Sequence, residues 1–94
     1  MRPPHPGSLL RYDVLPALDI PVAQAARELG VSRQLLHGIL AEKLPVSPEM
    51  AVRLGKWCGN GAYLWMALQQ DLDLWTAETK LAKTLSKIPT RRTG

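Results

Sequence analysis

Three polar residues near the start of a short helical segment have the chemistry to read DNA bases. At about 100° per residue, Arg33, Gln34 and His37 share the face opposite an apolar stripe. An arginine pairs with guanine through two hydrogen bonds, and a glutamine pairs with adenine in the same way. The alternative is a solvated polar face on an ordinary helical hairpin. The elements that position this face decide between the two interpretations.

Residues 22–40 predict a helix, a tight turn and a second helix, with the spacing of a helix-turn-helix unit. Ala26 is small, as it must be where two short helices cross steeply. Gly30 supplies the positive φ that a short turn needs, and Ser32 stands where the second helix needs an N-cap. The residues expected to face inward are Ala25, Leu29, Val31, Leu36, Ile39 and Leu40. Together these positions favour DNA binding by a unit at 22–41.

The segments before this unit also predict helices. Residues 1–5 are expected to be loose, and Pro6 is suited to the first position of a helix that runs to about Leu15. Its inward residues would be Leu9, Leu10, Val14 and Leu15. Pro16 is expected to limit this helix, and Pro21 to open the next one.

After the helix-turn-helix unit, the sequence Ser47-Pro48-Glu49 strongly predicts the start of another helix, which should end at Gly59. Asn60 is expected to cap a segment over 62–88 that forms either one long helix or two. No strand is predicted, so the fold class is all-α. We expect a helix-turn-helix domain over 1–79 and a basic extension over 80–94 that is partly helical or disordered.

The last helical segment carries two apolar stripes. Leu64, Leu68, Leu72 and Trp75 follow i, i+4 spacing, and the second stripe consists of Leu74, Leu81, Leu85 and Ile88. We expect one stripe for the core and one for a dimer or partner surface, formed by Leu74, Trp75, Leu81 and Leu85. The alternative is that both stripes serve the core, or that the distal one frays.

Composition narrows the function classes. The net charge is +4, and Lys80, Lys83, Lys87, Arg91 and Arg92 form a basic tail without acids. This tail is either simply solvated or contacts the phosphates of DNA or RNA. The lone Cys58 and two distant histidines predict no metal site, no cofactor and no catalytic residue, so an enzyme is not expected. The absence of a long apolar run predicts no membrane association and a cytoplasmic location.

In order and spacing, these residues resemble the HigA-type antitoxins of the lambda-repressor-like (Xre) group. The resemblance covers roughly residues 5–78. Its motifs are His5-Pro6-Gly7, Leu29-Gly30-Val31-Ser32-Arg33-Gln34, Ser47-Pro48-Glu49-Met50-Ala51 with Arg53-Leu54, Trp65, Leu68-Gln69 and Asp73-Leu74-Trp75. The resemblance implies a compact five-helix DNA-binding domain with an extended C-terminal helix.

The resemblance also implies a function. Such a protein dimerises, binds its operator DNA, represses its own operon and neutralises a HigB-type toxin, a RelE-like mRNA endonuclease. By position, Ser32, Arg33, Gln34 and His37 would read bases, while Gln24 would face a phosphate. Lys43 would also help to position the DNA.

The chain departs from the family pattern in the second helix of the helix-turn-helix unit and just after it. Leu35 replaces a common Thr, Gly38 replaces a frequent Arg, and Ala41-Glu42 replaces the usual Asn-Gly. Gly38 removes one expected DNA contact, and Glu42 would repel phosphates. These departures bear on the strength and sequence preference of DNA binding rather than on its existence. They leave two alternatives open: a protein-interaction module with vestigial DNA binding, and a free-standing Xre-type regulator without a toxin.

Overall fold

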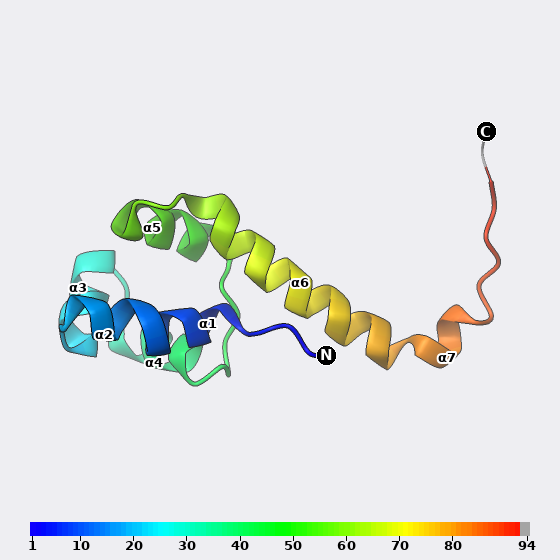
Figure 1. The fold of residues 1–94 in the computed structure, drawn as a ribbon, viewed down its shortest axis with the longest axis horizontal. Helices are drawn as coiled ribbons and strands as arrows, with labels where there is room; N and C mark the ends of the chain where they lie inside the picture. The colour runs from blue at the N-terminus through cyan, green and yellow to red at the C-terminus, as the bar shows by residue number, and fades with distance from the viewer. Residues whose placement is uncertain (93–94) are drawn as a thin grey trace.

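The computed structural model describes residues 1–92, and in this range it contains only helices and their connections (Figure 1). This confirms the all-α prediction. The elements are α1 (Pro6–Leu9), the π-helix η1 (Leu10–Val14), α2 (Leu15–Leu18), α3 (Val22–Leu29), α4 (Arg33–Leu40), α5 (Pro48–Cys58), α6 (Ala62–Lys80) and α7 (Ala82–Leu85). Because α1, η1 and α2 follow one another without a break, they count as one helical segment. With α3, α4, α5 and α6, this gives the five helical segments that were expected. The predicted extension over 80–94 ends in residues 93–94, which lie outside the described residues.

The first helical segment is longer than predicted, because Pro16 does not end it. The chain stays helical to Leu18, and Asp19 then takes a left-handed conformation with φ 53°. A proline inside an α-helix clashes with the carbonyl group four residues earlier. Here the preceding turn is a π turn, in which the Leu15 N–H donates to the Leu10 carbonyl five residues back. This wider turn gives the proline ring room, so the helix continues through it.

The N-terminus is more ordered than predicted at one residue, His5. Its side chain is buried, and its Nδ1 accepts a hydrogen bond of 2.9 Å from the Gly7 N–H. His5 is therefore the N-cap of α1, and Pro6 follows at the first helical position as expected. A Cβ at Gly7 would collide with the Ile39 carbonyl oxygen of α4. Glycine at this position lets the backbones of α1 and α4 approach closely.

The core lies between the helix-turn-helix unit, α5 and the first half of α6. Trp65 of α6 is its largest fully buried side chain, and the indole N–H donates to Asn60 Oδ1 at 3.0 Å. The expectation that Asn60 caps α6 is wrong, since Gly61 occupies the N-cap and no side chain caps the helix there. The Asn60 amide oxygen satisfies the buried indole instead.

The buried face of α6 consists of Trp65, Gln69 and Leu72. Leu64, which was expected on the inward stripe, is 40% exposed, so that stripe is displaced at its start. Gln69 is buried because its Oε1 accepts a 2.8 Å hydrogen bond from the Val46 N–H in the connector after α4. A buried backbone donor needs such a partner, and here a side chain 23 residues away supplies it.

The segment over 62–88 forms two helices, with a break at Leu81 (φ −96°, ψ 8°). The second half of α6 and α7 extend away from the body as an arm (Figure 1), and residues 76–92 are exposed throughout. We call residues 73–92 the arm. In the described part of the chain, no helix combines the length and apolar character needed to cross a membrane.

Candidate nucleic-acid interface

The turn between α3 and α4 is built as its sequence predicts. Gly30 has φ 74°, and its N–H donates to the Arg27 carbonyl at 3.2 Å. The Val31 N–H donates to the Ala26 carbonyl at 3.0 Å, which closes the C-terminus of α3. Ala26 is almost fully buried. The two helices of the unit are therefore in the close contact that Ala26 and Gly30 were expected to permit.

Ser32 caps α4 as predicted. Its Oγ accepts a hydrogen bond of 3.0 Å from the Leu35 N–H. A hydroxyl group is also a donor, and accepting this bond leaves its proton available to an external acceptor. Ser32 is exposed, so its hydroxyl group combines a structural role with access to solvent.

The three residues proposed as base readers are all exposed on α4. Arg33, Gln34 and His37 lie on the face opposite the buried Leu36, Ile39 and Leu40. Arg33 and Gln34 lie in the first turn of the helix, which Ser32 caps, and His37 lies in its last turn. This surface presents the guanidinium and amide donors that base edges accept.

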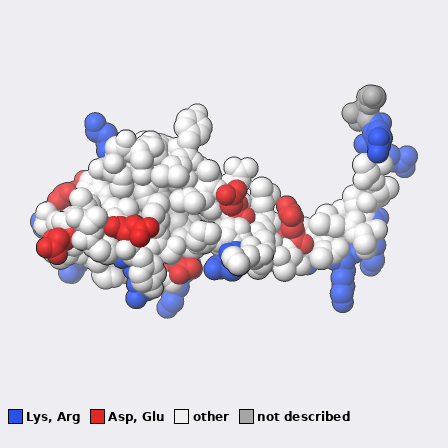
Figure 2. Space-filling view, in the orientation of Figure 1, with Lys and Arg blue, Asp and Glu red and all other residues white. Residues whose placement is uncertain are grey.

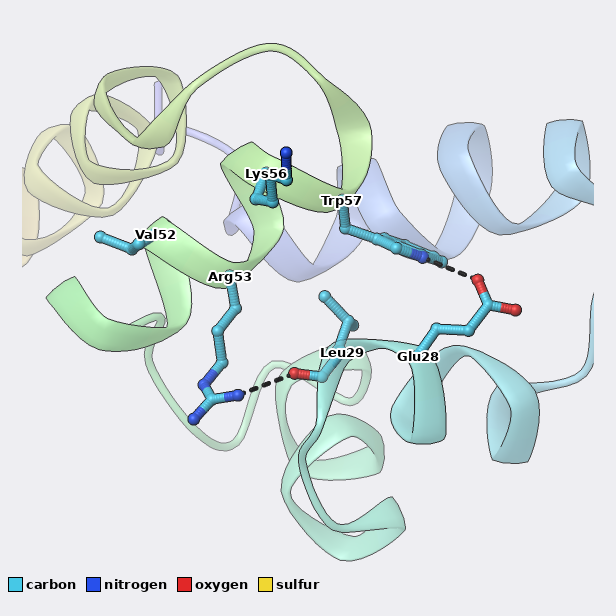
Figure 3. Close-up of a pocket in the computed structure, with 6 residues that line it drawn as sticks. All are labelled: Glu28, Leu29, Val52, Arg53, Lys56 and Trp57. Atoms are coloured by element: carbon cyan, nitrogen blue, oxygen red, sulfur yellow. Dashed lines mark hydrogen bonds between the residues drawn. The ribbon is translucent and has the colours of Figure 1, made fainter.

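Gln24 lies near the start of α3 and already has a partner within the protein. Its Nε2 donates to Glu28 Oε2 at 2.8 Å. Trp57 Nε1 of α5 donates to Glu28 Oε1 at 3.0 Å (Figure 3). The Trp57 indole N–H, and secondly the Gln24 amide, lower the pKa of the Glu28 carboxyl group. Sequence reasoning missed this network, because Glu28 and Trp57 are 29 residues apart and carry no local signal.

Arg53 of α5 is a second residue whose role only the structure shows. Its Nη1 donates to the Leu29 carbonyl at 2.9 Å (Figure 3). Its Nη2 donates to Glu49 Oε1 at 3.1 Å. Arg53 therefore satisfies a carbonyl group at the C-terminus of α3, which has no partner inside the helix. Together with Trp57, it ties α5 to the helix-turn-helix unit along a shared groove.

The loop after α4 departs from ideal geometry. Glu42 has φ 62°, a left-handed conformation that glycine adopts without strain, and its carboxylate lies 3.8 Å from the Arg2 guanidinium. Lys43 is exposed, and its backbone N–H donates to the Gly38 carbonyl at 2.9 Å. A Cβ at Gly38 would collide with the Leu44 side chain. A larger residue at this position would therefore displace the partly exposed Leu44 side chain that lies over it.

The surface charge divides the molecule into two regions. Figure 2 shows basic and acidic side chains mixed over the body, whereas Lys and Arg gather over α7 and the residues that follow it. In the proposed partner surface, Leu74, Leu81 and Leu85 are between 42% and 50% exposed, and Trp75 is half-buried. A dimer or partner role for these four residues stays a prediction.

Comparison with known proteins identifies the family. No family model matches the chain. It is 31% identical over 80 residues to the helix-turn-helix transcriptional regulator YbaQ of Escherichia coli K12, covering 85% of this chain and 71% of that protein. The structure of PA4674 from Pseudomonas aeruginosa in complex with its operator DNA is 37% identical, with a TM-score of 0.90 over 99% of both chains. The Pseudomonas aeruginosa antitoxin HigA, solved with the higBA promoter, is 36% identical, with a TM-score of 0.89 over 98% of this chain and 100% of that one.

The chain belongs to the HigA-type helix-turn-helix family. The similarity to solved HigA-type structures covers nearly the whole chain and so includes the arm. This confirms the resemblance drawn from the sequence motifs.

Proposed function

We propose that this HigA-type protein binds operator DNA through α4 and represses transcription of its own operon. The observation that carries the proposal is the outward face of Arg33, Gln34 and His37 on a complete helix-turn-helix scaffold. Support comes from PA4674 and HigA, whose structures were solved with operator or promoter DNA. Arg33 and Gln34 would read base edges, Ser32 and His37 would add contacts, and Gln24 and Lys43 would position the phosphates.

The decisive experiment is a gel shift with Arg33→Ala on DNA from upstream of the gene. Loss of a bidentate base contact should cost about 1–3 kcal/mol of binding free energy and relax sequence preference. Lys56→Ala is the matched control, since it removes one positive charge from an exposed position on α5. Unchanged affinity in the Arg33 variant would remove that residue from the reader.

We propose that the protein binds its operator as a dimer, as helix-turn-helix proteins do on operators with two half-sites. In the proposed dimer, each copy places α4 in one half-site, and the half-sites lie about 34 Å apart, one helical turn of DNA. Leu74, Trp75, Leu81 and Leu85 would form the contact, since the arm exposes apolar side chains beyond the body. Size-exclusion chromatography with light scattering tests this. A strict monomer at tens of micromolar would contradict it.

We further propose that the protein is the antitoxin of a type II system and binds a HigB-type, RelE-like mRNA endonuclease. The support is the family, which includes proteins named as HigA antitoxins. A short basic reading frame beside the gene would encode the partner. Co-purification of the two products, with loss of mRNA cleavage, would establish the pair. A neighbourhood without such a frame would instead favour a free-standing regulator.

One observation favours the interaction module as a second candidate. Gly38 offers no side chain to DNA, and Glu42 places a carboxylate beside the reader. If the arm binds a partner while the protein binds no DNA from upstream of the gene, the DNA-binding function of the helix-turn-helix unit is vestigial. Measuring both activities on one preparation separates this candidate from the repressor.

A further inference from the structure

Two hydrogen bonds from different helices meet on one exposed carboxylate. Trp57 of α5 donates to one oxygen of Glu28 at 3.0 Å (Figure 3). Gln24 of α3 donates to the other oxygen at 2.8 Å. We propose that Trp57 and Glu28 are positioning residues that orient the Gln24 amide toward a DNA phosphate. This inference rests on the proposed function. It adds Trp57 and Glu28 to the proposed DNA-binding site, although neither residue is expected to touch DNA.

The chemistry of the carboxylate fixes which end of the amide is turned toward it. An ionised carboxylate only accepts hydrogen bonds, so Gln24 must present its NH₂ group to Glu28. That nitrogen carries a second N–H, which remains available to a phosphate oxygen. The opposite orientation would present the amide carbonyl at that place, and a carbonyl oxygen repels a phosphate. Glu28 therefore selects the orientation of Gln24 that suits DNA.

Trp57 is needed because Glu28 is exposed. A free glutamate on a helix surface samples several rotamers, and ordering it costs conformational entropy. The indole nitrogen is a donor only, and it belongs to a half-buried ring that packs against the core. It fixes one carboxylate oxygen and leaves the other for Gln24. Arg53 binds the neighbouring Leu29 carbonyl from the same helix, so α5 is anchored to α3 beside this network.

The charge state of Glu28 is consistent with this role. Both hydrogen bonds lower the pKa of its carboxyl group, and the neighbouring Arg27 lowers it further, while desolvation opposes them. The group is therefore ionised at neutral pH and acts as an acceptor on both oxygens. The network operates under the conditions in which the protein would bind DNA.

The test is a double-mutant cycle on DNA affinity. Trp57→Phe removes the indole N–H and leaves an aromatic ring, and Gln24→Ala removes the proposed phosphate contact. Each should weaken binding to the operator and to an unrelated duplex alike, by about threefold to tenfold, the range of one net hydrogen bond. In the Gln24→Ala background, Trp57→Phe should cause no further loss, since there is then no amide to position.

A matched control removes the hydrogen-bonding group of an aromatic side chain elsewhere. Tyr63→Phe does so at an exposed position on α6, and it should leave DNA affinity unchanged with and without Gln24. If Trp57→Phe proves unfolded by circular dichroism, Glu28→Ala replaces it in the cycle. The charge lost in Glu28→Ala shifts affinity in both backgrounds, so the coupling to Gln24 remains the readout.

The outcomes separate the two proposals. Equal losses from Trp57→Phe with and without Gln24 would overturn the positioning role, as would a Gln24→Ala variant with wild-type affinity. Both results leave operator binding through α4 standing. A wild-type protein without preference for operator over unrelated duplex would overturn the proposed reader instead. The cycle on the unrelated duplex would then still decide whether Trp57 acts through Gln24.

Discussion

The two ends of the recognition helix α4 differ in how well their sequence suits their geometry. At the N-terminal end, Gly30 occupies a left-handed position, Ser32 caps the helix, and Arg53 binds the Leu29 carbonyl. At the C-terminal end, the left-handed position is filled by Glu42, and Gly38 lies within the helix under the Leu44 side chain. The end that presents the proposed base readers is the unstrained one.

This difference shows where precision is needed. Base contacts depend on placing side chains to within a fraction of an ångström. The turn before the proposed base readers is held by the Gly30 and Val31 hydrogen bonds to α3 and by the Arg53 hydrogen bond from α5 to the Leu29 carbonyl. The loop after α4 contributes phosphate contacts at most, which tolerate looser placement. Strain and an unfavourable charge are therefore found at the end where they interfere least with reading bases.

The largest expected effect on stability comes from a substitution in the turn at the N-terminal end of α4. Gly30→Ala places a Cβ at φ 74°, at a cost of about 1–2 kcal/mol, and this Cβ would lie 2.9 Å from Arg53 Nη1. We expect a total loss of roughly 2 kcal/mol in the free energy of unfolding, because the Arg53 hydrogen bond is disturbed as well. Urea denaturation measures it. A loss below about 0.5 kcal/mol would mean that the turn relaxes without cost.

Removing the cap of α4 should have a smaller effect. Ser32→Ala loses one helix-capping hydrogen bond, for about 1 kcal/mol of stability. Ser47→Ala is the matched control, since Ser47 caps α5 through the Met50 N–H at 3.1 Å. Both variants should lose similar stability, but only Ser32→Ala should lose operator affinity beyond its effect on folding. Equal affinities would assign Ser32 a structural role alone.

At the strained end, a substitution should improve the protein. Glu42→Gly relieves the left-handed strain at a cost in chain entropy, for a net gain of up to about 1 kcal/mol of stability. It also removes a carboxylate near Lys43, so DNA binding should tighten most at low salt. Glu42→Gln separates the two effects: it removes the charge and keeps the strain. Loss of stability in Glu42→Gly would show that the ion pair with Arg2 outweighs the strain.

The smallest expected effect is on pH dependence. The pKa of Glu28 is lowered in the folded protein, so its contribution to stability is present above the unfolded pKa. That contribution is lost as the pH falls through the lowered, folded pKa. In Trp57→Phe the main cause of the shift is gone, and the Glu28 pKa should rise toward its ordinary value. Carboxyl titration by NMR measures the change, and an unmoved titration would contradict the indole as its cause.

The parts of the fold that the sequence predicted are those set by local interactions. Gly30, Ser32 and Ser47 act on neighbours within a few residues, so their types alone indicate their roles. The prediction for Pro16 was wrong because the effect of a proline depends on the hydrogen-bond register of the preceding turn, which here is a π turn. Sequence periodicity does not distinguish the two registers.

Two of the contacts that sequence reasoning missed join distant parts of the chain. The Gln69 bond to Val46 spans 23 residues, and the Trp57 bond to Glu28 spans 29. Each of these polar side chains resembles an ordinary helix-surface residue until its partner is placed beside it. The candidate readers were found because exposure follows from helical spacing, whereas the network that orients Gln24 depends on tertiary packing.

The arm changes how a single copy of the protein behaves in solution. A compact chain of this length has a radius of gyration of about 12 Å, whereas the Cα value here is 16.4 Å, with principal extents of 50 × 27 × 21 Å. The isolated chain is thus a rod-shaped particle with more hydrodynamic drag than its mass implies. It tumbles fastest about its long axis, and a column calibrated with spherical standards overstates its size.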